Sequence, residues 1–384
     1  MEMGRTSACL QHGVMLVQAL CQPRVSQPHS PRAARPALQT ANHSPVPAAC
    51  KIHASTQAPS APRLPLIGQH MYDPARDYKL LVVNLDNTLL RSNKTLSPAA
   101  VRFIAAASAK GKQVVVCSGR AASEALPYWG TQPDGSPGLA AAGVRHAILS
   151  DGCETWTMGA TPEQSRATCR TLLAPRMVRC VMDVLRNRDL LVQAVMDDGY
   201  FHASERMLPR AGEFYQNNDI NPSVFRDTIA HPSLYAYLEA HLTQVERFFV
   251  FHRNFDERMD TMVRLRSQPV SLALLHATQL HIDPMGTNKA TGLVGLCHEL
   301  GVSFDDVMAI GDSPGDQTYL RMAGCSVAMG NAVRHVQDWC DLVVADADHD
   351  GAAEAIERYF LASEPVGPAV GVSDAPPTAA DDEI

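Results

Sequence analysis

The sequence predicts an α/β protein with a doubly wound parallel sheet and an inserted α+β domain. Apolar segments of strand length alternate with capped helical segments on both sides of the insertion, as βα units require. Between residues 154 and 281 this alternation gives way to hairpin and mixed signals. That stretch is long enough to form a domain of its own.

The first strand is predicted over 80–83, where four apolar residues stand in a row. Such a run is typical of a strand that is buried on both faces. Ser97 and Pro98 form an N-cap and first-turn pair for a helix over 99–110. The remaining elements expected before the insertion are a strand at 113–117, a helix from Ala121 and a strand at 146–150.

The insertion opens with an amphipathic helix and a hairpin that turns at Asp198 and Gly199. Its expected elements are a helix at 176–188, strands at 190–196, 200–203 and 248–251, a helix at 256–267 and a strand at 270–275.

The βα alternation returns at Lys289, and the helix that follows ends at Gly301, a typical C′ residue. The elements expected from here are a helix at 290–300, a strand at 307–310, a helix up to Gly324, strands at 326–329 and 342–344, and a helix at 352–360.

The composition of the chain limits the kinds of partner that we expect for it. The 384 residues are 46% hydrophobic, enough for a sizeable core and one to three domains. The net charge of -7 and pI near 6.1 leave no basic footprint, so we expect no nucleic-acid partner. No apolar run reaches the length of a membrane span, so we expect no membrane partner. The ten cysteines lack C-x-x-C spacing, and those in apolar segments, such as Cys117, Cys297 and Cys325, are interpreted as free and buried.

Residues 1–67 differ in composition from the rest of the chain. Glu2 is the only acidic residue before Asp73, whereas arginine, serine, alanine and proline are frequent. This is typical of an organellar transit peptide, with the chloroplast favoured over the mitochondrion. The alternatives are a disordered extension or a misassigned start codon of a cytoplasmic protein. The Pro-, Ala- and Asp-rich tail, 362–384, is predicted to be disordered.

Polar side chains follow several of the predicted strands, at the edge where open α/β sheets place ligands. Asn84 and Asp86 end the first strand, and Ser118, Gly119 and Arg120 end the second. The Ser118 hydroxyl could donate to a phosphate or simply cap a helix. Lys289 could neutralise a phosphate or be a solvated surface residue. Asp312 and Asp316, in a Gly/Pro turn after a strand, suit a cation such as Mg²⁺ or a solvated loop.

Together, and in this order, these segments resemble the four motifs of the haloacid dehalogenase (HAD) superfamily over about 78–360. Asn84 to Thr88 (NLDNT) is similar to its first motif, Asp-x-Asp-x-Thr. Four further segments resemble signatures of the Cof-like sugar-phosphatase branch: ILSDGC from Ile148, HIDPMGTNK from His281, GDSPGD from Gly311 and DGAA from Asp350. The resemblance implies a Rossmannoid core over 78–153 and 282–361, with a C2-type cap over 154–281.

The resemblance also implies phosphoryl transfer through an aspartyl-phosphate, with a small phosphorylated metabolite as partner. Asp86 matches the acid/base, and Ser118 and Lys289 match the second and third motifs. Thr88, Gly119 and Arg120 are expected to contact substrate. Mg²⁺ is expected at positions 84 and 86 and at Asp312 and Asp316. The sequence gives no signal for an oligomeric state.

Three positions depart from the family pattern: Asn84 replaces the nucleophilic Asp, Asn87 the usual Gly, and Gly315 the usual Asn. A carboxamide is not a competent nucleophile, and it removes one negative charge. Asn84 could instead be an introduced trapping substitution or a sequencing error, or slow deamidation could regenerate Asp. Two hypotheses follow: a Mg²⁺-dependent hydrolase by descent with weak or no turnover, or a disabled member that binds a phosphorylated ligand or a protein partner in an organelle.

Overall fold

The computed structural model describes residues 72–161, 164–215, 225, 228–274 and 278–361. The predicted leader, 1–67, and tail, 362–384, lie outside the described residues. Within these described ranges, no helix has both the length and the apolar character needed to cross a bilayer.

An eight-stranded sheet forms the core, in the order β14-β13-β12-β1-β2-β3-β4-β5. The six strands from β14 to β3 run parallel to one another, as the apolar runs predict. The strands are β1 (Leu80–Asn84), β2 (Gln113–Cys117), β3 (His146–Leu149), β4 (Glu154–Thr157), β5 (Arg166–Arg170), β12 (Val307–Gly311), β13 (Cys325–Ala328) and β14 (Leu342–Val343).

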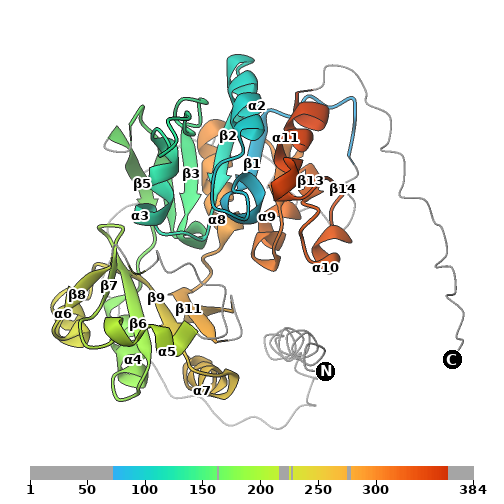
Figure 1. Cartoon of the computed structure of the whole chain (residues 1–384). Helices are drawn as coiled ribbons and strands as arrows, with labels where there is room; N and C mark the ends of the chain where they lie inside the picture. Colours follow the sequence, from blue (N-terminus) through green and yellow to red (C-terminus); the bar gives the residue numbers. More distant parts are fainter. Residues whose placement is uncertain (1–71, 162–163, 216–224, 226–227, 275–277, 362–384) are drawn as a thin grey trace, which may run out of the picture. The chain divides into compact units, whose positions relative to one another are not determined.

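Successive side chains of a strand point to opposite faces of the sheet. Because the parallel strands are largely apolar, both faces carry apolar side chains, and helices cover both. Leu81 and Val83 of β1 share an apolar cluster with α2 (Pro98–Ala109) and α11 (Gly351–Ala355). Leu80 and Val82 lie in another cluster, with α8 (Lys289–Leu300) and α9 (Gln317–Leu320). The doubly wound arrangement is therefore present, and Figure 1 shows it in the blue-to-green and orange-to-red parts of the chain.

The expected start of the insertion at Glu154 is too early. β4 and β5 are antiparallel and extend the core sheet beside β3, so the sheet is mixed at this edge. The cause is a tight reversal after β3, where Ser150, Asp151 and Gly152 all have positive φ angles. This reversal pairs Leu149 with Glu154, and the chain leaves the core sheet only after Arg170.

A separate six-stranded sheet forms the insertion, in the order β10-β11-β9-β6-β7-β8. Its last strand runs through Pro284, so the insertion also ends later than the expected residue 281, because HIDP pairs with β9 and β10. The strands are β6 (Leu191–Met196), β7 (Phe201–Ser204), β8 (Ile229–His231), β9 (Val245–Phe251), β10 (Val270–Leu274) and β11 (Gln279–Pro284).

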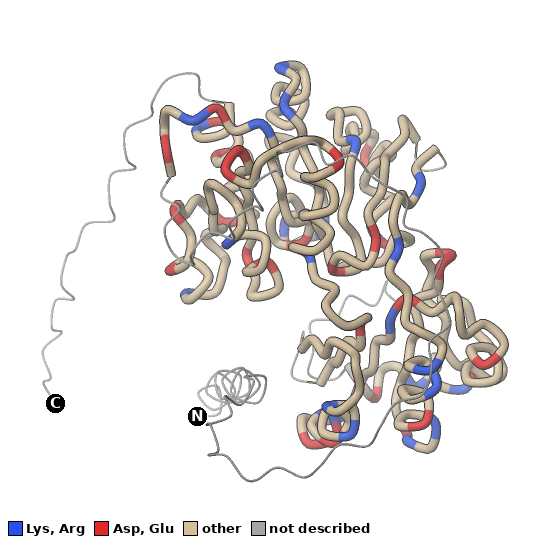
Figure 2. Tube along the Cα trace, turned by 180° about the vertical axis from the view of Figure 1, so that it is seen from behind, with Lys and Arg blue, Asp and Glu red and all other residues tan. Residues whose placement is uncertain are grey.

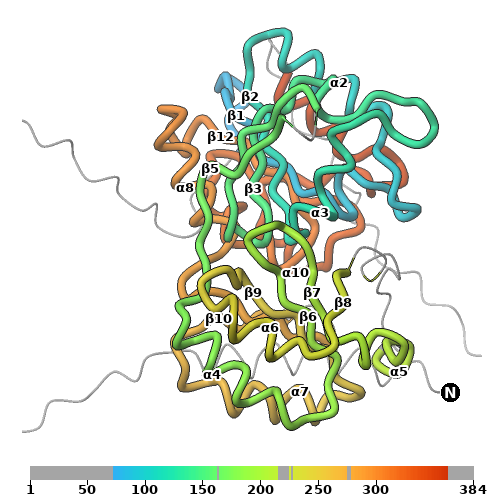
Figure 3. Tube along the Cα trace, turned by 90° about the vertical axis from the view of Figure 1, so that its left-hand side faces the viewer, coloured from blue at the N-terminus to red at the C-terminus, as the bar shows by residue number. Residues whose placement is uncertain are grey.

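The longer helices of the insertion, α4 (Pro175–Leu185) and α7 (Phe255–Leu265), pack together on one side of this sheet (Figure 3). On the sheet itself, Leu191, Val195 and Phe249 form an apolar cluster that includes Ala121 of the core. The remaining α-helices of the described residues are α3 (Ala122–Ala125), α5 (Gly212–Tyr215), α6 (Leu234–Ala240) and α10 (Arg334–Gln337).

Acidic and basic residues are interspersed along the traces of both sheets (Figure 2). Cys117, Cys297 and Cys325 are buried and free, as the sequence predicted.

Candidate active site

The ends of β1, β2 and β12 lie side by side at one edge of the core sheet. Val83 pairs with Ile310, and Asn84 pairs with Cys117. This register places Asn84, Ser118 and the loop after Gly311 at neighbouring strand ends, where the crevice of an open α/β sheet binds ligands.

Asn84 is buried at the centre of this edge. Its Nδ2 donates to Asp312 Oδ1 at 2.8 Å and to the backbone oxygen of Asp86 at 3.2 Å, and lies 3.4 Å from Asp316 Oδ2. Its Oδ1 accepts from the Leu85 N–H at 2.8 Å and from Lys289 Nζ at 3.3 Å. Both ends of the carboxamide are therefore engaged.

The turn after β1 brings Thr88 to the same carboxylate. Asn87 has a φ of 53°, a conformation that Asn adopts more readily than most residues, so its replacement of Gly is tolerated. The Thr88 hydroxyl, which is buried, donates to Asp312 Oδ1 at 3.0 Å. The segment after β1 and the loop after β12 are thus in direct contact.

The Asp86 carboxylate faces a different set of partners. Arg120 donates to both of its oxygens at 2.7 Å, a bidentate pair, and Lys94 Nζ lies 3.2 Å from Oδ1. Burial opposes ionisation, but the Arg120 hydrogen bonds and charge outweigh it and lower the pKa of Asp86. Asp86 is therefore held as a carboxylate. Sequence reasoning missed Lys94, whose only signal was a positive charge soon after the first motif.

The loop after β12 is held together by its own groups. Asp316 Oδ2 accepts from the backbone N–H groups of Asp312 and Ser313 at 3.1 and 3.0 Å, and from the Ser313 hydroxyl at 2.9 Å. A Cβ at Gly311 would meet Tyr319 Oη at 2.7 Å, so glycine is required there. At Gly315 a Cβ would meet only Ser313 Oγ at 3.5 Å, so the family's Asn would fit there without a clash at its Cβ.

Lys289 joins this cluster from the start of α8. Its Nζ donates to Asp316 Oδ1 at 2.7 Å, and the residue is buried. Burial alone would lower the lysine pKa, but the Asp316 charge raises it above its usual value. Burial and the Asp316 charge likewise raise the pKa of Asp312. The interpretation of Lys289 as a solvated surface residue is excluded.

Ser118 and Gly119 lie beside the cluster. The Ser118 hydroxyl is buried and accepts from the Arg120 N–H at 3.2 Å. The Gly119 carbonyl accepts from Arg247 at 3.3 Å, and Asp151 leaves no room for a Cβ at Gly119. Arg247, on β9, also contacts Asp151 at 2.9 Å and Asp283 at 2.7 Å. We call the group of Asp151, Glu154, Glu246, Arg247, His281 and Asp283 the junction cluster, because it joins the two sheets.

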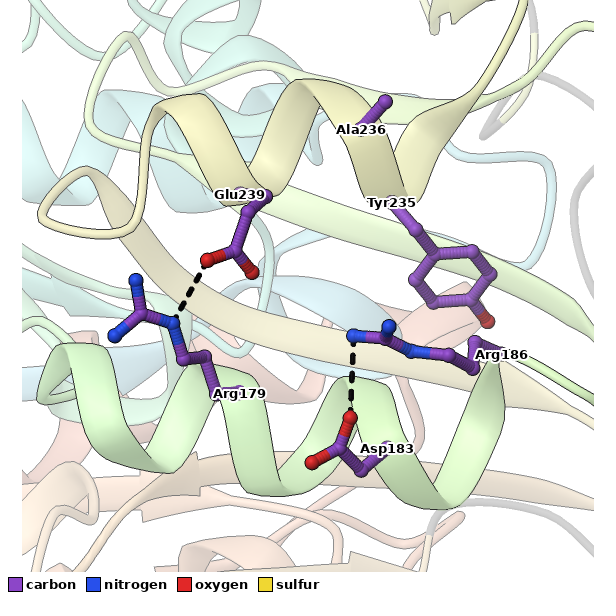
Figure 4. Close-up of a pocket in the computed structure, with 6 residues that line it drawn as sticks. All are labelled: Arg179, Asp183, Arg186, Tyr235, Ala236 and Glu239. Carbon is purple, nitrogen blue, oxygen red and sulfur yellow. Dashed lines mark hydrogen bonds and ion pairs between the residues drawn. The ribbon is translucent and has the colours of Figure 1, made fainter.

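A surface pocket of about 460 Å³ lies elsewhere, between α4 and α6 of the insertion (Figure 4). Its charged side chains neutralise one another: Arg179 pairs with Glu239 at 2.8 Å, and Arg186 with Asp183 at 3.1 Å. None of the residues predicted for the active site lines it.

An open α/β sheet thus carries carboxylates, a buried lysine and a Ser-Gly-Arg segment at adjacent strand ends, an arrangement that suits a phosphate-binding α/β protein. The chain belongs to the haloacid dehalogenase-like hydrolase family, whose model matches residues 81–356, and to its Cof-like branch. A hydrolase or phosphatase ancestry is therefore established at the level of the family.

Three relatives illustrate this membership. The chain is 25% identical over 304 residues to the chloroplastic endoribonuclease YBEY of Arabidopsis thaliana, covering 76% of this chain but only 48% of that protein. It is 24% identical to 5-amino-6-(5-phospho-D-ribitylamino)uracil phosphatase YitU of Bacillus subtilis, covering 73% of this chain and 97% of that protein. A haloacid dehalogenase-like hydrolase from Bacteroides thetaiotaomicron shares the fold, with a TM-score of 0.60, 23% identity and coverage of 74% and 100%.

Phosphatases of this family generally use Mg²⁺. The residues at the expected positions do not fit that ion as they are arranged here. The Asn84 side chain presents N–H groups, not an oxygen, to Asp312 Oδ1 and to the Asp86 carbonyl. Among the described residues, no group of three or more His, Cys, Asp or Glu side chains is arranged to hold a metal.

Proposed function

We propose that this protein binds a small phosphorylated metabolite, such as a sugar phosphate, and hydrolyses it slowly or not at all. The observation that carries the proposal is the Asn84 carboxamide at the position of the family's nucleophile. An amide oxygen has little nucleophilicity, and this one already accepts hydrogen bonds from Leu85 and Lys289.

The acid/base position supports the same proposal. A general acid must release a proton to the leaving group near neutral pH. Asp86 carries a bidentate Arg120 and a lowered pKa, so it is a weak proton donor in this state. Ligand binding requires neither a nucleophile nor a proton donor. Lys94, Arg120 and Lys289 place three cationic groups around the site, and each can contact a phosphate oxygen.

The choice of ligand rests on relatives. YitU is named for the hydrolysis of a phosphorylated ribityl compound, a sugar-alcohol phosphate. A phosphomonoester with a polyol body is therefore the ligand class to test first. A fully active Mg²⁺-dependent phosphatase is the alternative, and it is favoured only by the family's ancestry.

The test separates binding from turnover in the full chain. Isothermal titration with a panel of sugar phosphates should show binding to at least one, while phosphate release from the same compounds stays near background. Lys289→Met should abolish the binding, and Lys110→Met, at an exposed lysine outside the site, should not. Rapid Mg²⁺-dependent release of phosphate, with Asn84 verified by mass spectrometry, would overturn the proposal.

We also propose an organellar location, with the chloroplast favoured over the mitochondrion and the cytoplasm. The acid-poor, arginine-containing leader over 1–67 supports import, and the Arabidopsis relative is named as chloroplastic. A fluorescent fusion of the full chain should enter an organelle, and a fusion of residues 68–384 should not. Cytosolic retention of the full-length fusion would contradict the proposal.

A further inference from the structure

We infer that the Asn84 carboxamide takes the structural place of a divalent cation, so that the oxygens around it are held together by N–H groups and the folded site is independent of metal. The inference concerns the same site as the proposed function and rests, like it, on the loss of the carboxylate at position 84. It goes further, because it concerns what stabilises the site and not whether the site reacts.

The geometry around Nδ2 carries the inference. Its three oxygen neighbours, Asp312 Oδ1, Asp316 Oδ2 and the Asp86 carbonyl, come from the three residues that the family resemblance assigns to the metal besides position 84 itself. An amide nitrogen has two hydrogens, which the contacts at 2.8 and 3.2 Å use. Mg²⁺ needs oxygens at about 2.0–2.1 Å. The oxygens here surround a hydrogen-bond donor at hydrogen-bond distances.

The neighbours of the amide also fix its orientation. In the observed state Oδ1 faces two donors, the Leu85 N–H and the Lys289 ammonium. Rotating the amide by half a turn would place its N–H groups against those donors and its oxygen against the Asp312 carboxylate. Because every contact would then be repulsive, only one assignment of oxygen and nitrogen satisfies the site.

The charges of the site balance without a metal. It holds three carboxylates and three cationic side chains: Asp86, Asp312 and Asp316, with Lys94, Arg120 and Lys289. Asp312 has no cation paired with it within the described site, and it accepts from Asn84 and Thr88 instead. An aspartate at position 84 would add a fourth negative charge directly against Asp312. Such an arrangement needs a cation, whereas the natural one does not.

Thermal unfolding of the full chain and of Asn84→Asp, each in excess EDTA and in millimolar MgCl₂, tests this inference. The natural chain should unfold at the same temperature in both, within about 1 °C. Asn84→Asp should unfold at a lower temperature in EDTA and gain at least about 4 °C with Mg²⁺. The double variant Asn84→Asp/Asp312→Asn, which restores the charge count, should lose most of that gain.

A Mg²⁺-dependent rise for the natural chain as large as that of Asn84→Asp would overturn the inference. If Asn84→Asp does not fold in EDTA, calorimetric titration of the natural chain with MgCl₂ decides instead, and binding at micromolar concentrations would contradict us. The proposed function fails separately: a natural chain that hydrolyses phosphate esters but shows no Mg²⁺ shift refutes the function and leaves the inference standing. A natural chain whose unfolding temperature rises with Mg²⁺ but which hydrolyses no phosphate ester refutes the inference and leaves the proposed function standing.

Discussion

The active site and the junction cluster are both buried polar groups, but they balance charge in different ways. At the active site each of two carboxylates is paired with at least one cation, and the third, Asp312, accepts from neutral donors. The junction cluster contains four carboxylates: Asp151, Glu154, Glu246 and Asp283. Arg247 forms ion pairs with Asp151 and Asp283, and Arg170 forms an ion pair with Glu154.

The difference has a physical consequence. Burial, followed by the charge of Glu154, raises the pKa of Glu246 well above its usual range. Burial raises the pKa of Asp283 to about 6, although Arg247 lies 2.7 Å away. The junction cluster therefore binds protons more tightly than free carboxylates do, most of all at Glu246. The active site carries a smaller excess of negative charge: among its described residues only Asp312, whose pKa burial and the Asp316 charge raise, lacks a paired cation, and the residue at the centre is a neutral amide.

Removing the cation of the junction cluster should have the largest effect on stability. Arg247→Leu leaves the buried Asp283 and the half-buried Asp151 without their partner, so we expect a loss of about 3–5 kcal/mol in the free energy of unfolding. Urea unfolding measures it. Arg253→Leu is the matched control, since Arg253 is partly exposed and its ion pairs are worth at most about 1 kcal/mol. Similar losses in the two variants would mean that the junction cluster is not a buried ionic network.

Part of the pH dependence of stability should come from the junction cluster, through Glu246. The pKa of Glu246 is raised in the folded state above the 4.5 of an unperturbed Glu, so the folded chain binds this proton more tightly than the unfolded chain. The resulting stability is fully present below that value and is lost as the pH rises through the folded-state pKa. The slope approaches about 1.4 kcal/mol per pH unit within this window.

Glu246→Gln keeps the shape of the side chain and removes its titration. Urea unfolding between about pH 5 and pH 8 should therefore give a flatter profile for this variant than for the natural chain. The exposed Glu239→Gln should leave the profile unchanged. A natural chain whose stability does not fall over this range would show that Glu246 is not protonated in the fold.

The smallest effect is expected at the acidic loop of the active site. Gly315→Asn restores the family's residue where a Cβ meets only Ser313 Oγ at 3.5 Å, so stability should change by less than about 0.5 kcal/mol. Gly311→Ala, in the same loop, meets Tyr319 Oη at 2.7 Å and should cost about 1–3 kcal/mol. Equal losses in the free energy of unfolding for Gly315→Asn and Gly311→Ala would mean that Tyr319 does not pack against Gly311 as the structure shows.

Much of the site was predictable because the ends of adjacent parallel strands meet at one edge. Four apolar residues before Asn84 identified β1, and the acidic turn after Val307–Ile310 identified the loop that meets it. The strand–strand pairing of β4 and β5 with the core was not predictable in the same way. It depends on the reversal at Ser150 to Gly152, whose positive φ angles include two non-glycine residues.

Side-chain partners were the least predictable feature. The pairing of Lys94 with Asp86 and the placement of Arg247 against Asp151 join residues through tertiary contacts that no local pattern encodes. The orientation of the Asn84 amide depends on donors and acceptors from three separate segments of the chain. The sequence could identify which residue was unusual, but only the structure could show what its two ends contact.

We propose that the Asn84 carboxamide is the main barrier to phosphate-ester hydrolysis in this chain. The most direct measurement is phosphate release by Asn84→Asp beside the natural chain, with Mg²⁺ and the same sugar phosphates. We expect a gain of at least roughly a hundredfold, about 2.7 kcal/mol of transition-state stabilisation, with Asp312→Asn cancelling it. Equal and substantial rates for both chains, with Asn84 confirmed chemically, would contradict the account.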